Sequence, residues 1–328
     1  MAGRVVFVAT SPRTPPGLLS WPAWQALRSA PVLVGTPDHP QLPFLADAGI
    51  KPVVVAPEAR TLYEGAVAGE TVVWLAGDAD ADLVREVGLQ AARSRDVEVE
   101  VVYGSYDLPG ARLLDVVAVM DRLRSPDGCP WDAKQTHDSL KPYLIEEAYE
   151  AYQAIEDGDL ADLREELGDV LLQVVFHARL AQEHEDAWSI DDVAGDLVDK
   201  LVRRHPHVFE GASAEDLDAT WEAMKREEKG RTSVTDGVPL SQPALSLAAK
   251  LQKRAERIGA PLPSYDGIGG QLWDLVARCR EQGLDPEAEL RTVARAYRDR
   301  LAALERHAHE EGTDPGSLTA EQWTSRWS

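Results

Sequence analysis

Hydrophobic positions divide the chain into two patterns. Up to about residue 105, short β-branched runs alternate with stretches of helical character. The runs are Val5–Val8, Val32–Gly35, Val53–Val55, Thr71–Leu75 and Val97–Val102. Alternation of this kind is typical of α/β units, so we predict a small α/β domain with a mainly parallel sheet over residues 1–105.

The pattern changes after residue 106. Apolar residues now recur at three- and four-residue spacing, as in Leu113, Val116, Val117, Met120 and Leu123. This spacing indicates amphipathic helices. We predict an all-α domain over residues 106–230, a polar linker over about 226–243, and a last helical region over 231–328. The expected fold class is therefore mainly α, with an all-α bundle preceded by a small α/β domain.

The last region contains a weak internal repeat. Leu167–Val175 can be laid over Ile268–Val276 with the glycine and most apolar positions in register. In this alignment Glu166 falls on Gly267 and Asp169 falls on Gly270, so the acidic residues are not kept. The repeat predicts a degenerate second copy and confines any acidic site to the first one.

Charge and cysteine content narrow the function classes. The net charge of −22 would repel a phosphate backbone, which argues against a nucleic-acid polymer as partner. The sequence has no apolar stretch of the roughly 18 residues that a membrane helix needs. Only Cys129 and Cys279 are present, which favours a reducing compartment, and we expect a cytoplasmic protein.

Four carboxylates flank a probable hairpin turn. Glu147 and Glu150 are three residues apart, as are Glu166 and Asp169, so each pair shares one helix face. Gly158 lies between two aspartates and is a good end for a helix. Glu150 and Glu166 each lie eight residues from Gly158, and Glu147 and Asp169 each lie eleven residues from it. An antiparallel hairpin would therefore bring the two helix faces to matching heights.

Such a cluster points to a divalent cation. Most E-x-x-E patterns are solvated helix faces, but two symmetric pairs interleaved with apolar residues favour a site. Converging carboxylates repel one another unless a cation neutralises them, and hard divalent ions take oxygen ligands. Mg²⁺, with Mn²⁺ as a substitute, is the natural occupant. Since Mg²⁺ often takes further ligands from substrate phosphates, phosphoanhydride chemistry is indicated.

Several motifs around the hairpin then resemble those of a known family. They are Gly128-Cys129-Pro130-Trp131-Asp132, Gln135-Thr136-His137-Asp138-Ser139-Leu140, the E-E-x-x-E of Glu146, Glu147 and Glu150, and the E-x-x-D of Glu166 and Asp169. Over residues 110–230 the sequence resembles the MazG nucleoside triphosphate pyrophosphohydrolases. The resemblance implies Mg²⁺-dependent hydrolysis of NTPs and dNTPs to the monophosphate and pyrophosphate, in nucleotide-pool housekeeping, by a homodimer.

The resemblance also implies roles for individual residues. Glu147, Glu150, Glu166 and Asp169 would ligate the metal, and Glu146 would be a further ligand or would orient a water. Substrate binding would fall to Trp131, Lys134, Tyr143, Lys200, Arg203, Arg204, Trp221 and Lys225. For Trp131 we prefer a packing role, and for Trp221 packing and substrate binding are equally good explanations. For the basic residues between 200 and 204, a solvated helix end explains the pattern as well as substrate binding does.

Two further interpretations concern the rest of the chain and the activity. The first 105 residues faintly resemble tetrapyrrole methylases, through Pro16-Gly17-Leu18-Leu19, Trp24-Gln25-Ala26-Leu27 and Ala76-Gly77-Asp78, but lack the glycine-rich methyl-donor loop. We interpret them as a truncated, catalytically silent remnant. The alternatives for the activity are a pyrophosphatase for one narrow substrate, such as a modified dNTP, and a non-catalytic helical module that binds divalent metal.

Overall fold

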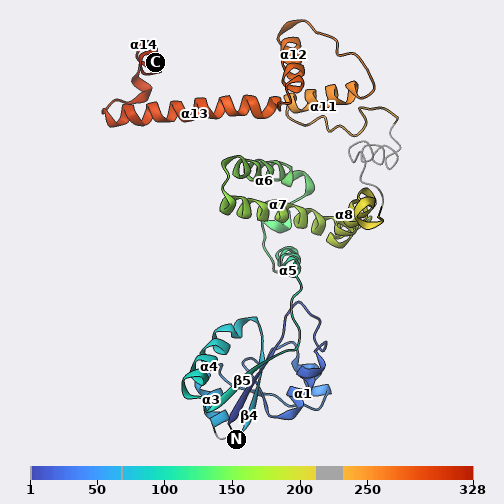
Figure 1. The fold of residues 1–328 in the computed structure, drawn as a ribbon, viewed down its shortest axis with the longest axis vertical. Coiled ribbons are helices and arrows are strands. Elements are labelled where there is room, and N and C mark those ends of the chain that lie inside the picture. Colours follow the sequence, from blue (N-terminus) through green and yellow to red (C-terminus); the bar gives the residue numbers. More distant parts are fainter. Residues whose placement is uncertain (1, 68, 212–231, 328) are drawn as a thin grey trace. The chain divides into compact units, whose positions relative to one another are not determined.

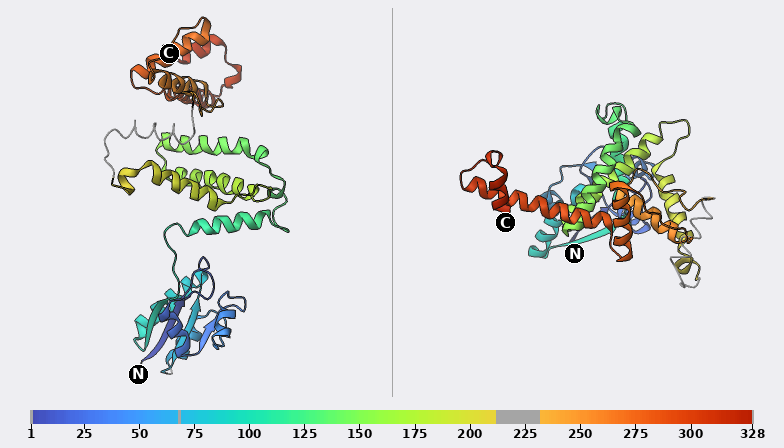
Figure 2. Two further views of the ribbon diagram at one scale, coloured as in Figure 1. Left: turned by 90° about the vertical axis from the view of Figure 1, so that its right-hand side faces the viewer. Right: turned by 90° about the horizontal axis from the view of Figure 1, so that it is seen from above.

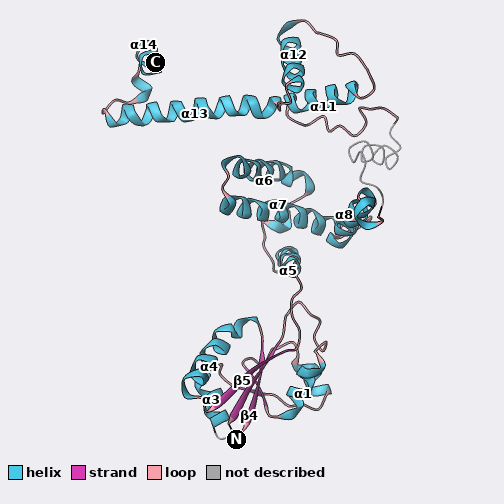
Figure 3. Cartoon of the chain, in the orientation of Figure 1, coloured by secondary structure: helices cyan, strands magenta, loops and turns pink. Residues whose placement is uncertain are grey.

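The computed structural model describes residues 2–67, 69–211 and 232–327. Within them every strand lies at or before Tyr103, and the later elements are helices (Figure 3). The expected fold class, mainly helical with an α/β region at the N-terminus, is confirmed. By their contacts the residues group into two compact units, Met1–Leu201 and Val202–Ser328. The division of the sequence at residues 105 and 230 stays a prediction.

The N-terminal strands form one five-stranded parallel sheet in the order β3-β2-β4-β1-β5 (Figure 1). Each predicted β-branched run contributes one strand. The strands are β1 (Gly3–Ala9), β2 (Val32–Val34), β3 (Val53–Val54), β4 (Thr71–Ala76) and β5 (Val97–Tyr103). The helices of this region are α1 (Trp21–Ser29), α2 (Leu42–Asp47), α3 (Ala59–Val67) and α4 (Ala81–Ser94), with a short 3-10 turn η1 (Asp78–Asp80) before α4.

Helices cover both faces of this sheet, which explains the continuous apolar run of β1. Val5 and Phe7 pack with buried residues of α3 and α4. The alternate residues Val6 and Val8 pack with buried residues of α1 and α2. Successive side chains of a strand point to opposite faces, so a strand covered on both sides needs apolar residues throughout.

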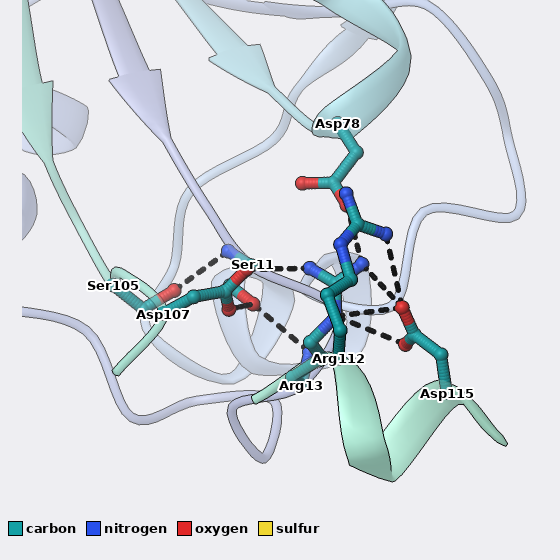
Figure 4. A network of polar contacts seen from close by, with 7 residues as sticks. All are labelled: Ser11, Arg13, Asp78, Ser105, Asp107, Arg112 and Asp115. Carbon is teal, nitrogen blue, oxygen red and sulfur yellow. Dashed lines mark hydrogen bonds and ion pairs between the residues drawn. The ribbon is translucent and has the colours of Figure 1, made fainter. Parts of the chain in front are cut away.

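Arg13 joins the sheet to the first helix that follows it, α5 (Arg112–Arg124). Its guanidinium lies 2.6 Å from Asp107, 2.7 Å from Asp115 and 3.0 Å from Asp78 (Figure 4). The hydrogen bond to Asp115 is the main cause that raises the pKa of Arg13 above its usual value, and it lowers the pKa of Asp115. The loop after β1 therefore holds the start of α5.

The helical part of the first unit centres on two long antiparallel helices, α6 (His137–Asp157) and α7 (Leu160–Ala181) (Figure 1). Before them stands a 3-10 turn, η2 (Asp132–Lys134), and after them comes α8 (Ile190–Arg204), within which the boundary between the two units falls. Buried apolar side chains join α5, α6 and α7: Met120, Leu140, Val175, Phe176 and Leu180. This core fixes the hairpin that carries the acidic residues.

Local sequence sets where both hairpin helices begin. The hydroxyl of Thr136 accepts a hydrogen bond from the Ser139 amide at 3.1 Å, and the Thr136 amide donates to the Ser139 hydroxyl. Asp159 caps α7 by accepting from the amides of Ala161 and Asp162. Side-chain caps satisfy amides that have no partner within the helix, so each helix start is specified by one or two residues.

The second unit is helical throughout its described elements. These are α9 (Pro206–Phe209), α11 (Ala244–Glu256), α12 (Gly267–Glu281), α13 (Pro286–Glu310), the 3-10 turn η3 (Pro315–Ser317) and α14 (Ala320–Trp327), which follow the end of α8. Figure 1 and the right-hand view of Figure 2 show α13 as one continuous helix. Residues 232–243, within the predicted linker, form neither helix nor strand. No helix in the described ranges is both long and apolar enough to cross a membrane.

We predict that Gly158→Ala destabilises the protein by about 1 kcal/mol, because Gly158 has a φ of 70° and a Cβ is unfavourable in the left-handed region. The matched control is Gly195→Ala in the interior of α8, where a Cβ meets nothing within 4 Å. That variant should be more stable by about 0.5–1 kcal/mol. Urea unfolding measures both, and a loss of equal size in the two variants would contradict the prediction.

Candidate metal centre

The turn at Gly158 folds α6 back on α7, as the sequence predicted. Gly158 ends α6 in the left-handed conformation, and its amide and that of Asp159 donate to carbonyls of the last turn of α6. This arrangement satisfies helix-end carbonyls and is one that glycine favours. The two helices then run side by side, so residues equally far from Gly158 face one another across the hairpin.

Three of the predicted carboxylates come together on this hairpin. Glu147, Glu150 and Glu166 each offer an oxygen, and these oxygens all lie within 4.8 Å of one another. Glu147 and Glu166 are half-buried, whereas Glu150 is exposed. Asp169 is near enough to affect both half-buried carboxyls but is not one of this group of three. Three of the four expected carboxylates therefore converge, with Asp169 at the margin of the group.

The electrostatics show the cost of this convergence. Burial raises the pKa of Glu147 above its ordinary value, and a hydrogen bond to Glu150 and the charges of Asp169, Glu150 and Glu166 raise it further. Burial likewise raises the pKa of Glu166, as do the charges of Glu150, Asp162, Asp169 and Glu165. Like charges in a partly desolvated place disfavour ionisation. The cluster therefore favours a counter-charge.

The donor set fits a hard divalent cation such as Mg²⁺. All three clustered ligands are carboxylate oxygens, which Mg²⁺ and Ca²⁺ prefer over softer donors. Within residues 2–67, 69–211 and 232–327, no Lys or Arg forms an ion pair with Glu147, Glu150 or Glu166. In that part of the chain the negative charge is left for a cation from solution.

The motif Gly128-Cys129-Pro130-Trp131-Asp132 forms a tight turn between α5 and η2. A Cβ on Gly128 would lie 2.2 Å from the Leu123 carbonyl oxygen, so only glycine fits there. Arg124, whose side chain is 4% exposed, donates to the Asp132 carbonyl and pairs with Glu183 just past α7. The motif thus positions the approach to α6, which gives it a structural reason to be present.

The other predicted substrate residues are placed as follows. Trp131 is half exposed, and its ring meets Tyr143 of α6 edge to face at 6.3 Å between centroids. Lys134 lies in η2, and Glu146 is exposed on α6 beside Glu147. Lys200, Arg203 and Arg204 lie on the last turns of α8. Trp221 and Lys225 lie outside the described residues.

A histidine group beside the hairpin core was not foreseen. Nδ1 of His137 lies 2.7 Å from Nδ1 of His177, with the rings stacked, and His184 stacks on His137 at 5.8 Å. Burial lowers the pKa of His177, and so does the charge of His137. His137 and His177 lie 21 and 19 residues from Gly158, so the turn symmetry that predicted the carboxylates would also have paired them.

Comparisons with known proteins agree with this geometry. Residues 135–209 match a family model described as the MazG nucleotide pyrophosphohydrolase domain. The chain is 41% identical over 232 residues to a nucleoside triphosphate pyrophosphohydrolase of Mycobacterium tuberculosis, covering 66% of this chain and 69% of that protein. It is 38% identical over 240 residues to nucleoside triphosphate pyrophosphohydrolase/pyrophosphatase MazG of Thermotoga maritima, covering 65% of this chain and 93% of that protein.

A third relative is an uncharacterized 26.1 kDa protein of Streptomyces cacaoi, 56% identical over 216 residues, with 63% of this chain and 88% of that protein covered. The matched family segment contains all of α6 and α7, so Glu147, Glu150, Glu166 and Asp169 all lie inside it. The chain belongs to the MazG family of nucleoside triphosphate pyrophosphohydrolases.

We predict that Mg²⁺ raises the thermal unfolding temperature and that EDTA reverses the rise, because a ligand that binds only the folded state stabilises it. Glu150→Gln should raise the unfolding temperature in EDTA, since it removes one repelling charge, and should shrink the increment from Mg²⁺. Scanning calorimetry in both buffers measures the two effects.

The control variant for this measurement is Glu165→Gln. It makes the same change of charge beside Glu166 but does not touch the group of three, so the Mg²⁺ increment should persist. An equal increment in the wild type and in Glu150→Gln would show that the hairpin is not where the cation binds.

Proposed function

We propose that this protein hydrolyses nucleoside triphosphates to the monophosphate and pyrophosphate, with Mg²⁺ held by the α6–α7 hairpin. The observation that carries the proposal is the group of three carboxylate oxygens within 4.8 Å of one another, inside the segment that matches the MazG domain. The names of the M. tuberculosis and T. maritima relatives support the same reaction. Its site in the cell would be the cytoplasm, which suits two free cysteines.

The hairpin residues have one task in this proposal, which is to hold the cation. Glu147, Glu150 and Glu166 would ligate it, with Asp169 as the fourth ligand at the margin of the group. When bound, Mg²⁺ supplies positive charge that offsets the negative charge of the triphosphate, and it makes water a stronger nucleophile at neutral pH. Glu146, exposed beside Glu147, would add a ligand or orient the attacking water.

Substrate binding needs groups of the opposite sign and a surface for the base. We propose Lys134, Lys200, Arg203, Arg204 and Lys225 for the phosphates, because ammonium and guanidinium groups bind phosphate oxygens through charge-assisted hydrogen bonds. Trp131, Tyr143 and Trp221 would supply aromatic surface for the base. The edge-to-face pair of Trp131 and Tyr143 supports this, since both rings keep about half of their surface exposed.

The hairpin also supports assembly into a homodimer. Large apolar side chains are exposed along α6 and α7, among them Ile145, Tyr149, Ile155, Leu160 and Leu167. Monomeric proteins rarely leave contiguous apolar surface of this kind in water. Two hairpins packed together would bury it in a four-helix arrangement.

We predict that phosphorus NMR of ATP, dCTP or dUTP with the protein and Mg²⁺ shows the monophosphate and pyrophosphate as products. Glu147→Gln should lower turnover roughly 100-fold or more, because it removes a ligand for the cation that offsets the triphosphate charge. Relative rates among the three substrates, and with a modified dNTP, decide between a broad and a narrow substrate range.

The control for the hydrolysis experiment is again Glu165→Gln, which should keep turnover within about twofold because an exposed change outside the cluster has little effect. Nucleoside diphosphate and orthophosphate as products would contradict the proposal. So would full turnover by Glu147→Gln, and cation binding without any turnover would favour the non-catalytic module.

We predict that Ile155→Arg weakens the dimer, because a charge placed in an apolar interface loses its hydration. Light scattering behind size exclusion should give twice the chain mass of 35.9 kDa for the wild type and a smaller value for the variant. Leu240→Arg, at an exposed loop residue, should leave the mass unchanged. A wild-type mass of 35.9 kDa at every concentration would exclude the dimer.

A further inference from the structure

The second unit contains a cleft whose charge is opposite to that of the protein as a whole. The cleft has a volume of about 640 Å³. Five of the residues that line it are cationic, and we call these five the basic cleft: Lys250, Lys253, Arg254, Arg257 and Arg280. In a chain with a net charge of −22, gathering so many cations in one concave place requires a reason.

Three helices build this cleft. Lys250, Lys253, Arg254 and Arg257 follow the spacing i, i+3, i+4 and i+7, which places them on one face of α11 and its C-terminal end. Arg280 comes from α12, and Asp285 and Pro286 at the start of α13 also line the cleft. Figure 1 shows α11, α12 and the start of α13 together, and they contact one another.

Neighbouring groups hold two of the cations in place. The guanidinium of Arg254 donates to the carbonyls of Val234 at 2.7 Å and Asp236 at 2.8 Å. Carbonyl oxygens fix its position without cancelling its charge. Arg280 is held from behind by the fully buried Gln252, whose amide group also bonds to the Trp273 carbonyl, and by Glu256. These charges are therefore in position before any ligand arrives.

Among the lining residues that the structure describes, five are cationic and one, Asp285, is acidic. Asp285 uses its side chain to cap α13, accepting from the amides of Glu287 and Ala288, and Glu256 pairs with Arg280. Favourable interaction with the helix dipole explains basic residues in the last turn of α11. It does not explain Arg280 from a second helix, or the concave shape.

We propose that the basic cleft binds a small ligand through two or more linked phosphate groups. A surplus of positive charge suits a multiply charged anion, and Arg and Lys together are the usual binders of phosphate. The volume suits a ligand no larger than a nucleotide. The acidic remainder of the chain would repel a nucleic-acid polymer, so we commit to a small molecule.

Pyrophosphate and a nucleoside triphosphate share this chemistry, and they are the product and substrate of the proposed reaction. The cleft itself does not rest on that reaction, because none of its residues belongs to the α6–α7 hairpin. It would be a second anion site in the unit that has lost the acidic residues of the repeat. The basic cleft would let the protein respond to the concentration of pyrophosphate or of the nucleoside triphosphate independently of hydrolysis at the hairpin.

The test is a calorimetric titration of the full chain with sodium pyrophosphate in EDTA. Without divalent cation the hairpin carboxylates repel pyrophosphate, so binding reports the basic cleft. Wild type should bind saturably, and Lys253→Glu should weaken binding roughly tenfold or more. Arg306→Glu, exposed on α13 outside the cleft, makes the same change of charge and should stay within about twofold.

Parallel titrations separate the sources and the rival ligands. Glu150→Gln should bind as wild type does, which makes a failure here distinct from a failure of the hydrolysis proposal. Tighter binding of ATP than of pyrophosphate would identify a nucleotide as the source, and the reverse order would identify pyrophosphate.

Four results would overturn the proposal. They are absence of binding by the wild type, equal weakening by Lys253→Glu and Arg306→Glu, orthophosphate binding as tightly as pyrophosphate, and displacement of pyrophosphate by a single-stranded oligonucleotide that binds more tightly. The melting temperature of Lys253→Glu should match that of Arg306→Glu, since both side chains are exposed.

Discussion

Mutual repulsion among Glu147, Glu150 and Glu166 is the constraint around which the helical part of the first unit is built. The sequence places these groups on two helices, and the fold then brings their oxygens within 4.8 Å of one another. Repulsion and partial burial both disfavour that arrangement, as the raised pKa values of Glu147 and Glu166 record. Something else must hold the hairpin closed, and the apolar core between α5, α6 and α7 does so. A fold that spends stability on such a cluster has a use for it.

A chain of specific contacts connects that core to the rest of the first unit. Arg13 ties the start of α5 to the loops that follow β4 and β5. Arg124, near the end of α5, ties the turn before α6 to the residues just past α7. Each arginine satisfies several acceptors with one planar group, which fixes geometry better than a single lysine contact would. The α/β region therefore has a mechanical role, because it anchors the helix on which the hairpin packs.

The sequence allowed the strands, the turn at Gly158 and the convergence of three of the four expected carboxylates to be predicted, because each depends on local signals: β-branched runs, a glycine between aspartates, and helical spacing. The position of Asp169 at the margin was not predicted. Aspartate is one methylene shorter than glutamate, and the height of a residue along a helix does not say how far its side chain extends. The histidines and the basic cleft were missed for another reason. Arg280 lines the same cleft as Lys253 because α12 packs on α11, which no local pattern specifies, although the spacing of residues 250, 253, 254 and 257 was a partial signal.

The acidic hairpin and the basic cleft solve the same physical problem with opposite signs. Each gathers like charges that repel one another, so each is more stable with a counter-ion than without one. They differ in how the charges are assembled. One turn at Gly158 creates the acidic group from neighbouring segments, whereas the basic group needs two helices and the buried Gln252 to position Arg280. Helix propensity and the solubility that surface charge provides do not explain the basic group. A solvated basic helix would need neither the buried amide of Gln252 nor the packing of α12 on α11. This is why the cleft is better explained as a binding site than as a surface feature.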